Sequence, residues 1–422
     1  MPSALRMPEV GPFRRGFWRS PLRGPWLASL FSAALLPLLL ICAVTGFLSH
    51  AAYQPHLGHN AVFGGSGDGF DLYGWTWPAS PAWLYAATQG AHVVSGLAAI
   101  PILLAKLWTV IPKLFENPPI RSVAHLVERL SLALLVGGSL LVLATGVLNI
   151  QLWYPFRFPF VPAHYYAAIV FLAALAFHVA VKLPVVRAAF ARDGVLKPLR
   201  QDLEHTVPER DLPGTETSAP SDPAPPTLTR RALVAGVGAG SLGLAAMAVG
   251  QVVGGPLRAF ALLAPRGRGG FPVNKTFAAV GIERRRVGPG WRLRISVGGK
   301  AKRSLTREHL LAMEQVTARL PIACVEGWTT TQEWTGVRLI ELARLAGAEE
   351  ADRVEVRSLQ PAGAFRRATL NGSQLRAGSS LLALKANGKD LSLDHGYPAR
   401  VVVPALPGVH NTKWVGELAF PA

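Results

Sequence analysis

Four apolar stretches of about twenty residues each lie in the first half of this 422-residue chain. They cover residues 27–49, 83–105, 130–150 and 164–181. A helix of about 20 apolar residues crosses the ~30 Å hydrocarbon core of a bilayer. The whole chain is half apolar and only 16% charged, which is unusual for a soluble protein. The sequence therefore predicts an all-α bundle of four transmembrane helices at residues 27–200, after a basic segment at 1–26.

The Lys and Arg residues alternate between the two sides of these stretches. Segments 1–26, 106–129 and 182–231 carry five, four and eight of them, whereas 50–82 has none and 149–163 has one. Positive residues concentrate on the cytoplasmic side of membrane proteins. We therefore expect a multi-pass protein of the plasma membrane, in contact with lipid, with its N-terminus in the cytoplasm.

Aromatic residues crowd the uncharged loop and the residues around it. Such residues typically sit at the membrane–water interface, so we expect them to form an interfacial belt. They are Tyr53, Tyr73, Trp75, Trp77, Trp83 and Tyr85.

Residues 201–229 are rich in Pro, Ser, Thr and acidic residues and poor in large apolar ones, so we predict a disordered cytoplasmic linker. Arg230 and Arg231 then precede an apolar run of Gly, Ala and Val, which predicts a fifth transmembrane helix at 230–254. The arginine pair is either ordinary positive flanking or a twin-arginine export signal placed inside the chain. We favour the export signal because the run is only weakly hydrophobic. Residues 255–422 then lie on the periplasmic or extracellular side.

The exported part has the pattern of an α+β domain that is mostly β. Strands are predicted at 291–299, 354–359 and 399–406, and helices at 306–318 and 336–346. This part carries 25 Lys and Arg against 13 Asp and Glu. Such a charge suits an anionic ligand or membrane surface. No nucleic-acid-binding motif is present, so nucleic acid is not an expected partner.

The chain has two cysteines, and Cys42 lies inside an apolar stretch, so a disulfide to Cys324 is not expected. Cys324 follows a short apolar strand in the segment LPIACVEGWTTTQEW. It is either a buried core residue or a soft thiolate ligand for a redox metal.

Two separated motifs resemble the sulfite-oxidase-fold molybdenum enzymes: CVEGW, and LSLDHGYPARVVVPALPGVHNTKWVGEL further downstream. The resemblance covers about residues 270–422. It implies that Cys324 is the thiolate ligand of molybdenum beside a molybdopterin. It also implies that His395, Arg400 and Lys413 hold the phosphate of the pterin, and that Asn274 lies near the metal.

The residues after the cysteine depart from the sulfite oxidase pattern. Sulfite oxidases continue with Gly, Asn and Arg residues that help to form an anion pocket, whereas this chain has Val325, Glu326, Gly327 and Trp328. The sequence looks closer to the bacterial reductases that act on methionine sulfoxide in proteins. We therefore expect an oxo-transfer substrate, small or protein-borne, that is sulfoxide-like rather than sulfite.

Four histidines lie in the apolar stretches: His50, His92, His164 and His178. Ionisable residues inside a membrane are functional candidates, although these can also be polar packing residues. His164 and His178 are 14 residues apart, so they face within roughly 40° of each other with a rise of ~21 Å. This arrangement predicts one or two b haems, with His50 opposite His164 and His92 opposite His178. The four-helix unit resembles a b-type cytochrome membrane subunit.

Together these features predict a fused oxidoreductase that exchanges electrons between quinone or quinol, haem and a molybdopterin centre. Two alternatives remain open. One is a haem-bearing membrane anchor with a metal-free, sulfite-oxidase-like binding domain, and the other is a membrane receptor without a cofactor.

Overall fold

The computed structural model describes residues 10–53, 77–116, 120, 122–213, 215, 219–263, 265–266 and 269–422. The chain divides into two compact units, each built from separate segments. The first unit comprises Met1–Ala43, Val94–Leu148 and Ala163–Ala246. The second comprises Val44–Val93, Asn149–Pro162 and Met247–Ala422. Short segments that begin or end the long helices therefore belong to the second unit.

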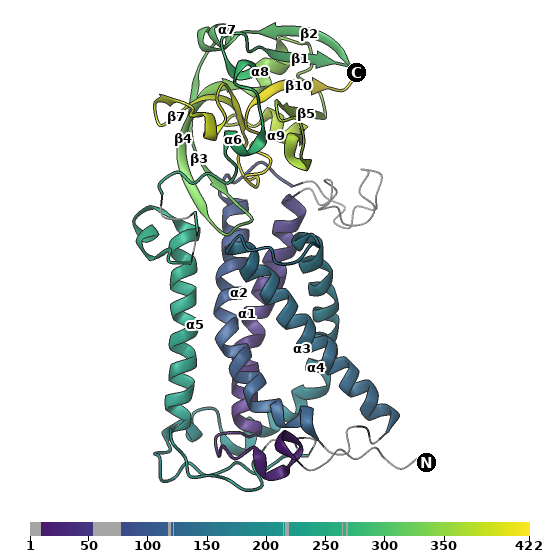
Figure 1. The fold of residues 1–422 in the computed structure, drawn as a ribbon, viewed down its shortest axis with the longest axis vertical. Coiled ribbons are helices and arrows are strands. Elements are labelled where there is room, and N and C mark those ends of the chain that lie inside the picture. The colour runs from purple at the N-terminus through teal and green to yellow at the C-terminus, as the bar shows by residue number, and fades with distance from the viewer. Residues whose placement is uncertain are drawn as a thin grey trace. The chain divides into compact units, whose positions relative to one another are not determined.

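Five long helices form at the positions that the apolar stretches predict (Figure 1). Each is long and apolar enough to cross a membrane, judged by length and composition. The helices are α1 (Pro25–Ala52), α2 (Leu84–Val110), α3 (Val123–Ile150), α4 (Phe160–Asp193) and α5 (Arg230–Val253). Short 3-10 helices are η1 (Gly11–Phe13), η2 (Arg15–Phe17), η4 (Ile111–Phe115), η5 (Lys197–Arg200), η6 (Gly255–Phe260), η7 (Arg284–Val287), η8 (Ala364–Arg366) and η9 (Leu393–His395).

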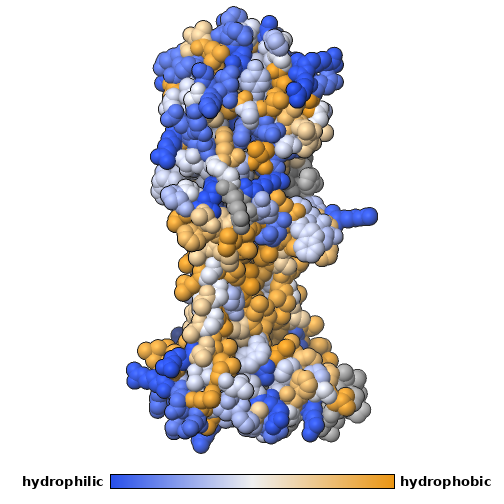
Figure 2. Space-filling view, turned by 60° about the vertical axis from the view of Figure 1, so that its left-hand side comes forward, coloured by the Kyte–Doolittle hydropathy of each residue, from blue (hydrophilic) through white to orange (hydrophobic). Residues whose placement is uncertain are grey.

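The first unit has a small core and a large apolar surface. Trp26, Leu27 and Phe31 on α1 pack against Ala99 and Leu103 on α2. Figure 2 shows apolar side chains gathered over the long helices, with hydrophilic ones at the end of this unit where its loops lie. Exposed apolar patches of this extent are rare on soluble monomers and mark interaction surfaces. Exposed members include Leu40, Ile41, Leu130, Leu134, Val170, Phe177 and Leu242.

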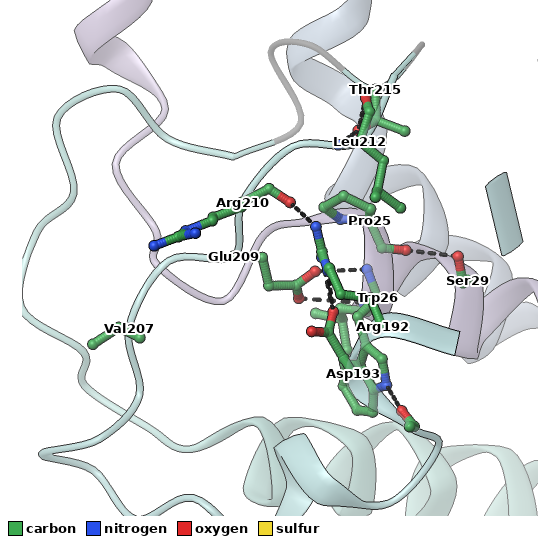
Figure 3. A network of polar contacts seen from close by, with 12 residues as sticks. Pro25, Trp26, Ser29, Arg192, Asp193, Val207, Glu209, Arg210, Leu212 and Thr215 are labelled. Atoms are coloured by element: carbon green, nitrogen blue, oxygen red, sulfur yellow. Dashed lines mark hydrogen bonds and ion pairs between the residues drawn. The ribbon is translucent and has the colours of Figure 1, made fainter. Parts of the chain in front are cut away.

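Residues 201–229 form no helix or strand where the structure describes them, but they pack against the first unit. The Glu209 carboxylate accepts hydrogen bonds from the backbone N–H of Trp26 (2.6 Å) and Leu27 (3.4 Å), at the start of α1 (Figure 3). The first N–H groups of a helix lack intrahelical partners and favour an anion. Arg230 is 2% exposed and donates to the side chain of Gln201 and the carbonyl of Val207. The segment that we predicted to be a disordered linker thus contains a buried acid with defined partners.

The second unit contains two five-stranded sheets (Figure 1). One has the order β2-β1-β10-β5-β6, with β1 parallel to β10, and the other runs β3-β4-β7-β8, with β9 also paired to β7. The strands are β1 (Leu293–Val297), β2 (Lys300–Leu305), β3 (Val316–Ala323), β4 (Thr329–Arg338), β5 (Arg353–Ser358), β6 (Arg367–Asn371), β7 (Leu381–Ala386), β8 (Lys389–Asp390), β9 (Arg400–Val402) and β10 (Val415–Phe420). The short helices are α6 (Phe277–Val280), α7 (Arg307–Ala312), α8 (Leu339–Arg344) and α9 (Gly372–Arg376). The α+β, mostly β prediction agrees with this part of the chain.

Two predicted helices are shorter in the structure. Of 306–318, only α7 is helical; Thr306 and His309 form a capping box at its start. The following residues enter β3, where Val316 pairs with Gly336 of β4. Of 336–346, the first three residues complete β4 before α8 begins. The helical pattern was wrong at these ends because strand pairing overrides local propensity.

The aromatic residues expected to form an interfacial belt are not all at the surface. Tyr53, Trp77 and Tyr85 are at most 5% exposed, whereas Trp83 is 60% exposed. Trp77 and Tyr85 belong to the core of the second unit, and the Trp77 indole donates to the carbonyl of Ala405 at 2.7 Å. Trp77 and Tyr85 are therefore packing residues of the second unit's core. Tyr73 and Trp75 lie outside the described residues.

Candidate active site

Cys324 lies in the turn that joins β3 to β4 and is 4% exposed. Its backbone N–H donates to the carbonyl of Trp328 (2.9 Å), and the N–H of Gly327 donates to the carbonyl of Cys324 (3.0 Å). Gly327 has φ +82°, a conformation that favours glycine. Residues 324–328, here called the cysteine turn, are therefore a tight and locally specified hairpin.

Cys324 lines a pocket of about 300 Å³, part of which is open to solvent. Asn274, Arg400 and Lys413 line the same pocket, so segments more than a hundred residues apart converge there. The other lining residues are Phe271, Pro272, Ile322, Trp328, Thr330 and Gly408. His395 lies beside the pocket, because its ring stacks on Phe271 with 3.6 Å between ring centroids. The structure thus gathers the five residues singled out in this part of the sequence.

Arg400 and Lys413 are buried cations, 4% and 8% exposed. Lys413 Nζ donates to the carbonyls of Lys275 and Asp394, both at 2.8 Å. Arg400 Nη1 donates to the carbonyl of His395 at 3.4 Å, and its Nε has no hydrogen-bond partner within the described chain. Burial lowers the pKa of Arg400 to about 9. Burial, with a smaller contribution from Arg400, lowers the pKa of Lys413 to about 7. An anion in this pocket would stabilise both charges.

Tryptophans and a glycine hold these cations in place. The Arg400 guanidinium lies 5.3 Å from the ring of Trp334, and Lys413 Nζ lies 5.2 Å from the ring of Trp414, both within cation–π range. Gly396 has φ +113°, and a Cβ there would stand 3.1–3.2 Å from the Cβ atoms of Lys413 and Arg400. Only glycine permits this close approach without displacement. Trp334 and Trp414, both at most 1% exposed, are packing residues that also contact the cations.

The Cys324 thiol is neutral in this environment. Burial, followed by the charge of Glu326, raises its pKa well above the ordinary value. A bound metal would favour the thiolate, because metal ligation deprotonates thiols. Burial also lowers the pKa of His395.

Glu326 has partners of its own and does not line the pocket. It forms an ion pair with Arg266 (2.8 Å) and accepts a hydrogen bond from the Trp328 indole (2.8 Å). Arg266 also donates to the carbonyl of Asn274. Sequence reasoning missed Arg266, and its only signal was the unusual acid two residues after the cysteine.

The four helix histidines are half-buried and are divided between the two units, so the predicted His50–His164 and His92–His178 pairings stay predictions. In the second unit, His92 lies against Gly46 of α1, where a Cβ would stand 2.7 Å from Nδ1. Gly46 is one helical turn from His50. In the first unit, His164 Nδ1 is 3.0 Å from Thr145 Oγ1, and its ring lies against Gly146.

The match to a known protein family concerns the same region. Residues 281–422 match the family model of the oxidoreductase molybdopterin binding domain. The chain is 34% identical over 143 residues to the protein-methionine-sulfoxide reductase catalytic subunit MsrP of Xanthomonas axonopodis pv. citri, covering 30% of this chain and 44% of that protein. It is 32% identical over 100 residues to mitochondrial sulfite oxidase of Mus musculus, covering 22% and 18%.

The sulfane dehydrogenase SoxCD from Paracoccus pantotrophus is a similar solved structure, at 26% identity and TM-score 0.28, covering 32% of this chain and 38% of that one. The chain spans less than half the length of each of these three proteins. The match to the family model lies in the part of the chain that contains Cys324, Arg400 and Lys413. Residues 281–422 are therefore similar to an oxidoreductase molybdopterin binding domain.

Proposed function

We propose that this chain is a membrane-bound, molybdenum-dependent oxidoreductase that passes electrons between the quinone pool, b haem and a molybdopterin centre. The observation that carries the proposal is the pair of buried cations in the pocket of Cys324. Arg400 and Lys413 have no carboxylate partner among the residues that the structure describes. Buried charges without a counter-charge are costly, and a phosphate accepts charge-assisted hydrogen bonds from both Arg and Lys. The pocket therefore fits the terminal phosphate of molybdopterin.

In this proposal each residue of the pocket has a separate role. Cys324 supplies the protein's sulfur ligand, and Arg400 and Lys413 bind the phosphate. His395, stacked on Phe271, lies at the edge of the pocket, with its Nδ1 2.8 Å from Ser392 Oγ and its Nε2 3.3 Å from the Phe271 carbonyl. Asn274 lines the same pocket and is the candidate neighbour of the metal. The bound molybdenum centre would supply two-electron oxygen-atom exchange with the substrate.

The lining of the pocket favours a neutral oxo substrate over sulfite. If Arg400 and Lys413 bind phosphate, the remaining lining side chains are uncharged apart from the Cys324 ligand. Glu326, one of the residues that depart from the sulfite oxidase pattern, is paired with Arg266 and does not line the pocket. The preference therefore rests on the lack of a further cation among the described lining residues. We propose a sulfoxide-like substrate, free or protein-borne.

The helices would carry b haem, in one or two copies, with His50, His92, His164 and His178 as the candidate iron ligands. His92 and His164 each lie against a glycine, which lets the imidazole approach the backbone of a neighbouring helix closely. His164 Nδ1 lies 3.0 Å from Thr145 Oγ1, and a hydrogen bond at one ring nitrogen is a usual way of fixing the orientation of a ligand histidine.

We place the chain in the plasma membrane, with the N-terminus in the cytoplasm and residues 255–422 outside. Support comes from the five apolar helices and from exposed aromatic side chains between α3 and α4, which suit an interface with lipid. Trp153, Tyr154, Phe156 and Phe158 are 41–64% exposed.

Analysis of the purified full-length protein tests the proposal. We expect haem absorption bands, about one molybdenum per chain and a phosphate-bearing pterin. Haem without molybdenum would support a membrane anchor with a metal-free binding domain instead. The lack of both would indicate a membrane receptor, and either result would refute the proposed reaction.

A further inference from the structure

The cysteine turn is held from outside the molybdopterin-binding domain by the end of α3. Asn149 Nδ2 donates a hydrogen bond to the carbonyl of Val325 at 3.0 Å. Tyr154 in turn donates its hydroxyl to Asn149 Oδ1 at 3.2 Å. Both residues belong to the segment Asn149–Pro162, which is part of the second unit. The side-chain oxygen of Asn149 is thus held by Tyr154, and its side-chain nitrogen is bonded to the cysteine turn.

The opposite side of the turn is closely packed against helix residues of the same unit. A Cβ at Gly327 would stand 3.0 Å from Gln251 Nε2 on α5, 3.4 Å from Val93 on α2 and 3.5 Å from Ile150 on α3. Gln251 is fully buried. The cysteine turn therefore has little room to move away from Asn149.

The hydrogen bond from Asn149 acts on the residue that follows Cys324 in the chain. Val325 directly follows Cys324, and the hairpin bonds of the turn connect its carbonyl rigidly to the cysteine backbone. Groups that hydrogen-bond around a metal ligand fix its direction, and losing one typically weakens metal affinity or activity about 10–100-fold.

We propose that Asn149 is a positioning residue for the metal site: its bond to Val325 fixes the direction in which Cys324 presents its sulfur. This inference rests on the proposed function, because it takes Cys324 as the metal ligand. Asn149 lies outside residues 281–422, so the segment between the long helices contributes to the site of the C-terminal domain.

The experiment compares Asn149→Leu with wild type and with Gln151→Leu as the matched control. Gln151 also donates its amide to a carbonyl, that of Leu263, but it does not bond to the cysteine turn. The first readout is hydrogen–deuterium exchange of residues 324–328 in cofactor-free protein. The second is the molybdenum content and the Mo(V) resonance spectrum of loaded protein. Turnover with a soluble dye is the third.

In Asn149→Leu we expect exchange of the Cys324 and Gly327 amides to rise about tenfold, because the turn loses its outer hydrogen bond. Molybdenum content or dye-linked turnover should fall about tenfold or more, with a shifted Mo(V) spectrum and unchanged pterin content. Gln151→Leu should match wild type in every readout.

Unchanged exchange in Asn149→Leu overturns the proposal, and so does faster exchange with a wild-type molybdenum spectrum and turnover. Wild-type protein without molybdenum refutes the proposed function instead, and this is seen before any variant is compared. If Asn149→Leu does not fold, Tyr154→Phe removes only the bond that orients Asn149, and it should change the same readouts in the same direction. If Tyr154→Phe then matches wild type in these readouts, the proposal is overturned.

A second pair of variants tests the packed side of the turn. Gly327→Ala should perturb the molybdenum spectrum through its contact with Gln251. Gly299→Ala is the control, because Gly299 has a similar φ of +76° with open space around it. Equal behaviour of the two alanine variants would show that the packing on the cysteine turn has no effect on the site.

Discussion

Arg230 and Glu209 form an ion pair, with 3.5 Å between Nε and Oε1, in which the two side chains are only 2% and 8% exposed. The first residue of the arginine pair therefore has a structural role inside the first unit. Burial raises the pKa of Glu209, while the N–H groups of Trp26 and Leu27 and the charge of Arg230 oppose that shift. Breaking a buried pair on one side typically costs about 3–5 kcal/mol.

The first prediction separates this packing role from an export signal. If the arginine pair directs export, changing Arg230 and Arg231 to Lys should leave residues 255–422 inside, protected from external protease. Glu209→Gln is the control: it breaks the ion pair and should lower the melting temperature without changing protease accessibility. If the double Lys variant is as accessible as wild type, the pair is only flanking charge.

The second prediction concerns Cys324. Cys324→Ser replaces a soft thiolate by a poorly acidic hydroxyl, so molybdenum content or turnover should fall by about two orders of magnitude. Pterin should remain, because Arg400 and Lys413 bind the phosphate independently of the sulfur. Metal analysis and pterin fluorescence check this, with Cys42→Ser as the control. Full activity of Cys324→Ser would show that Cys324 is a core residue and not the metal ligand.

The third prediction gives the opposite pattern. Arg400→Ala removes a charge-assisted donor worth about 1.5–3 kcal/mol, which corresponds to roughly 10–150-fold in affinity. Pterin occupancy should therefore fall, as measured by released pterin per chain. Arg294→Ala removes an exposed arginine from β1 and should leave occupancy unchanged. Equal occupancy in the two variants would place the phosphate elsewhere.

The fourth prediction concerns pH. Burial lowers the pKa of Lys413 to about 7 from an ordinary value of 10.5. Between these two values the unfolded chain holds a proton that the folded chain lacks, so stability of the cofactor-free protein should rise with pH from about 7 to 10. Lys413→Met should flatten this rise in melting temperature. Bound phosphate raises the pKa of Lys413 again, so the loaded protein should depend less on pH. An identical pH profile of wild type and Lys413→Met, both cofactor-free, would contradict this.

The fifth prediction concerns haem. His178→Ala should remove or shift an absorption band while the protein still inserts into the membrane, because the imidazole is the proposed iron ligand. His125→Ala, at the start of α3, should leave the spectrum intact. An intact spectrum in His178→Ala together with a lost or shifted band in His125→Ala would reassign the iron ligand to His125.

Much of the architecture follows from local sequence. The lengths of the apolar stretches predicted the five long helices, because a run of apolar residues satisfies its backbone hydrogen bonds most simply as a helix. The resemblance of the cysteine motif and the basic motif to a known enzyme family predicted which residues of the C-terminal domain meet. Cys324 and Gly327 form a hairpin bond within the motif, and Gly396 permits the approach to Arg400 and Lys413.

Other features depended on contacts between residues far apart in the chain. The sequence by itself determined where the long helices and the tight turns form, through apolar length and glycine positions, whereas strand pairing set the bounds of α7 and α8. Only the tertiary structure placed Arg266 beside Glu326, Trp77 in the core of the second unit and Asn149 on the cysteine turn. Hydrogen bonds and ion pairs between distant residues depend on how the finished elements pack, and a single sequence does not record that packing.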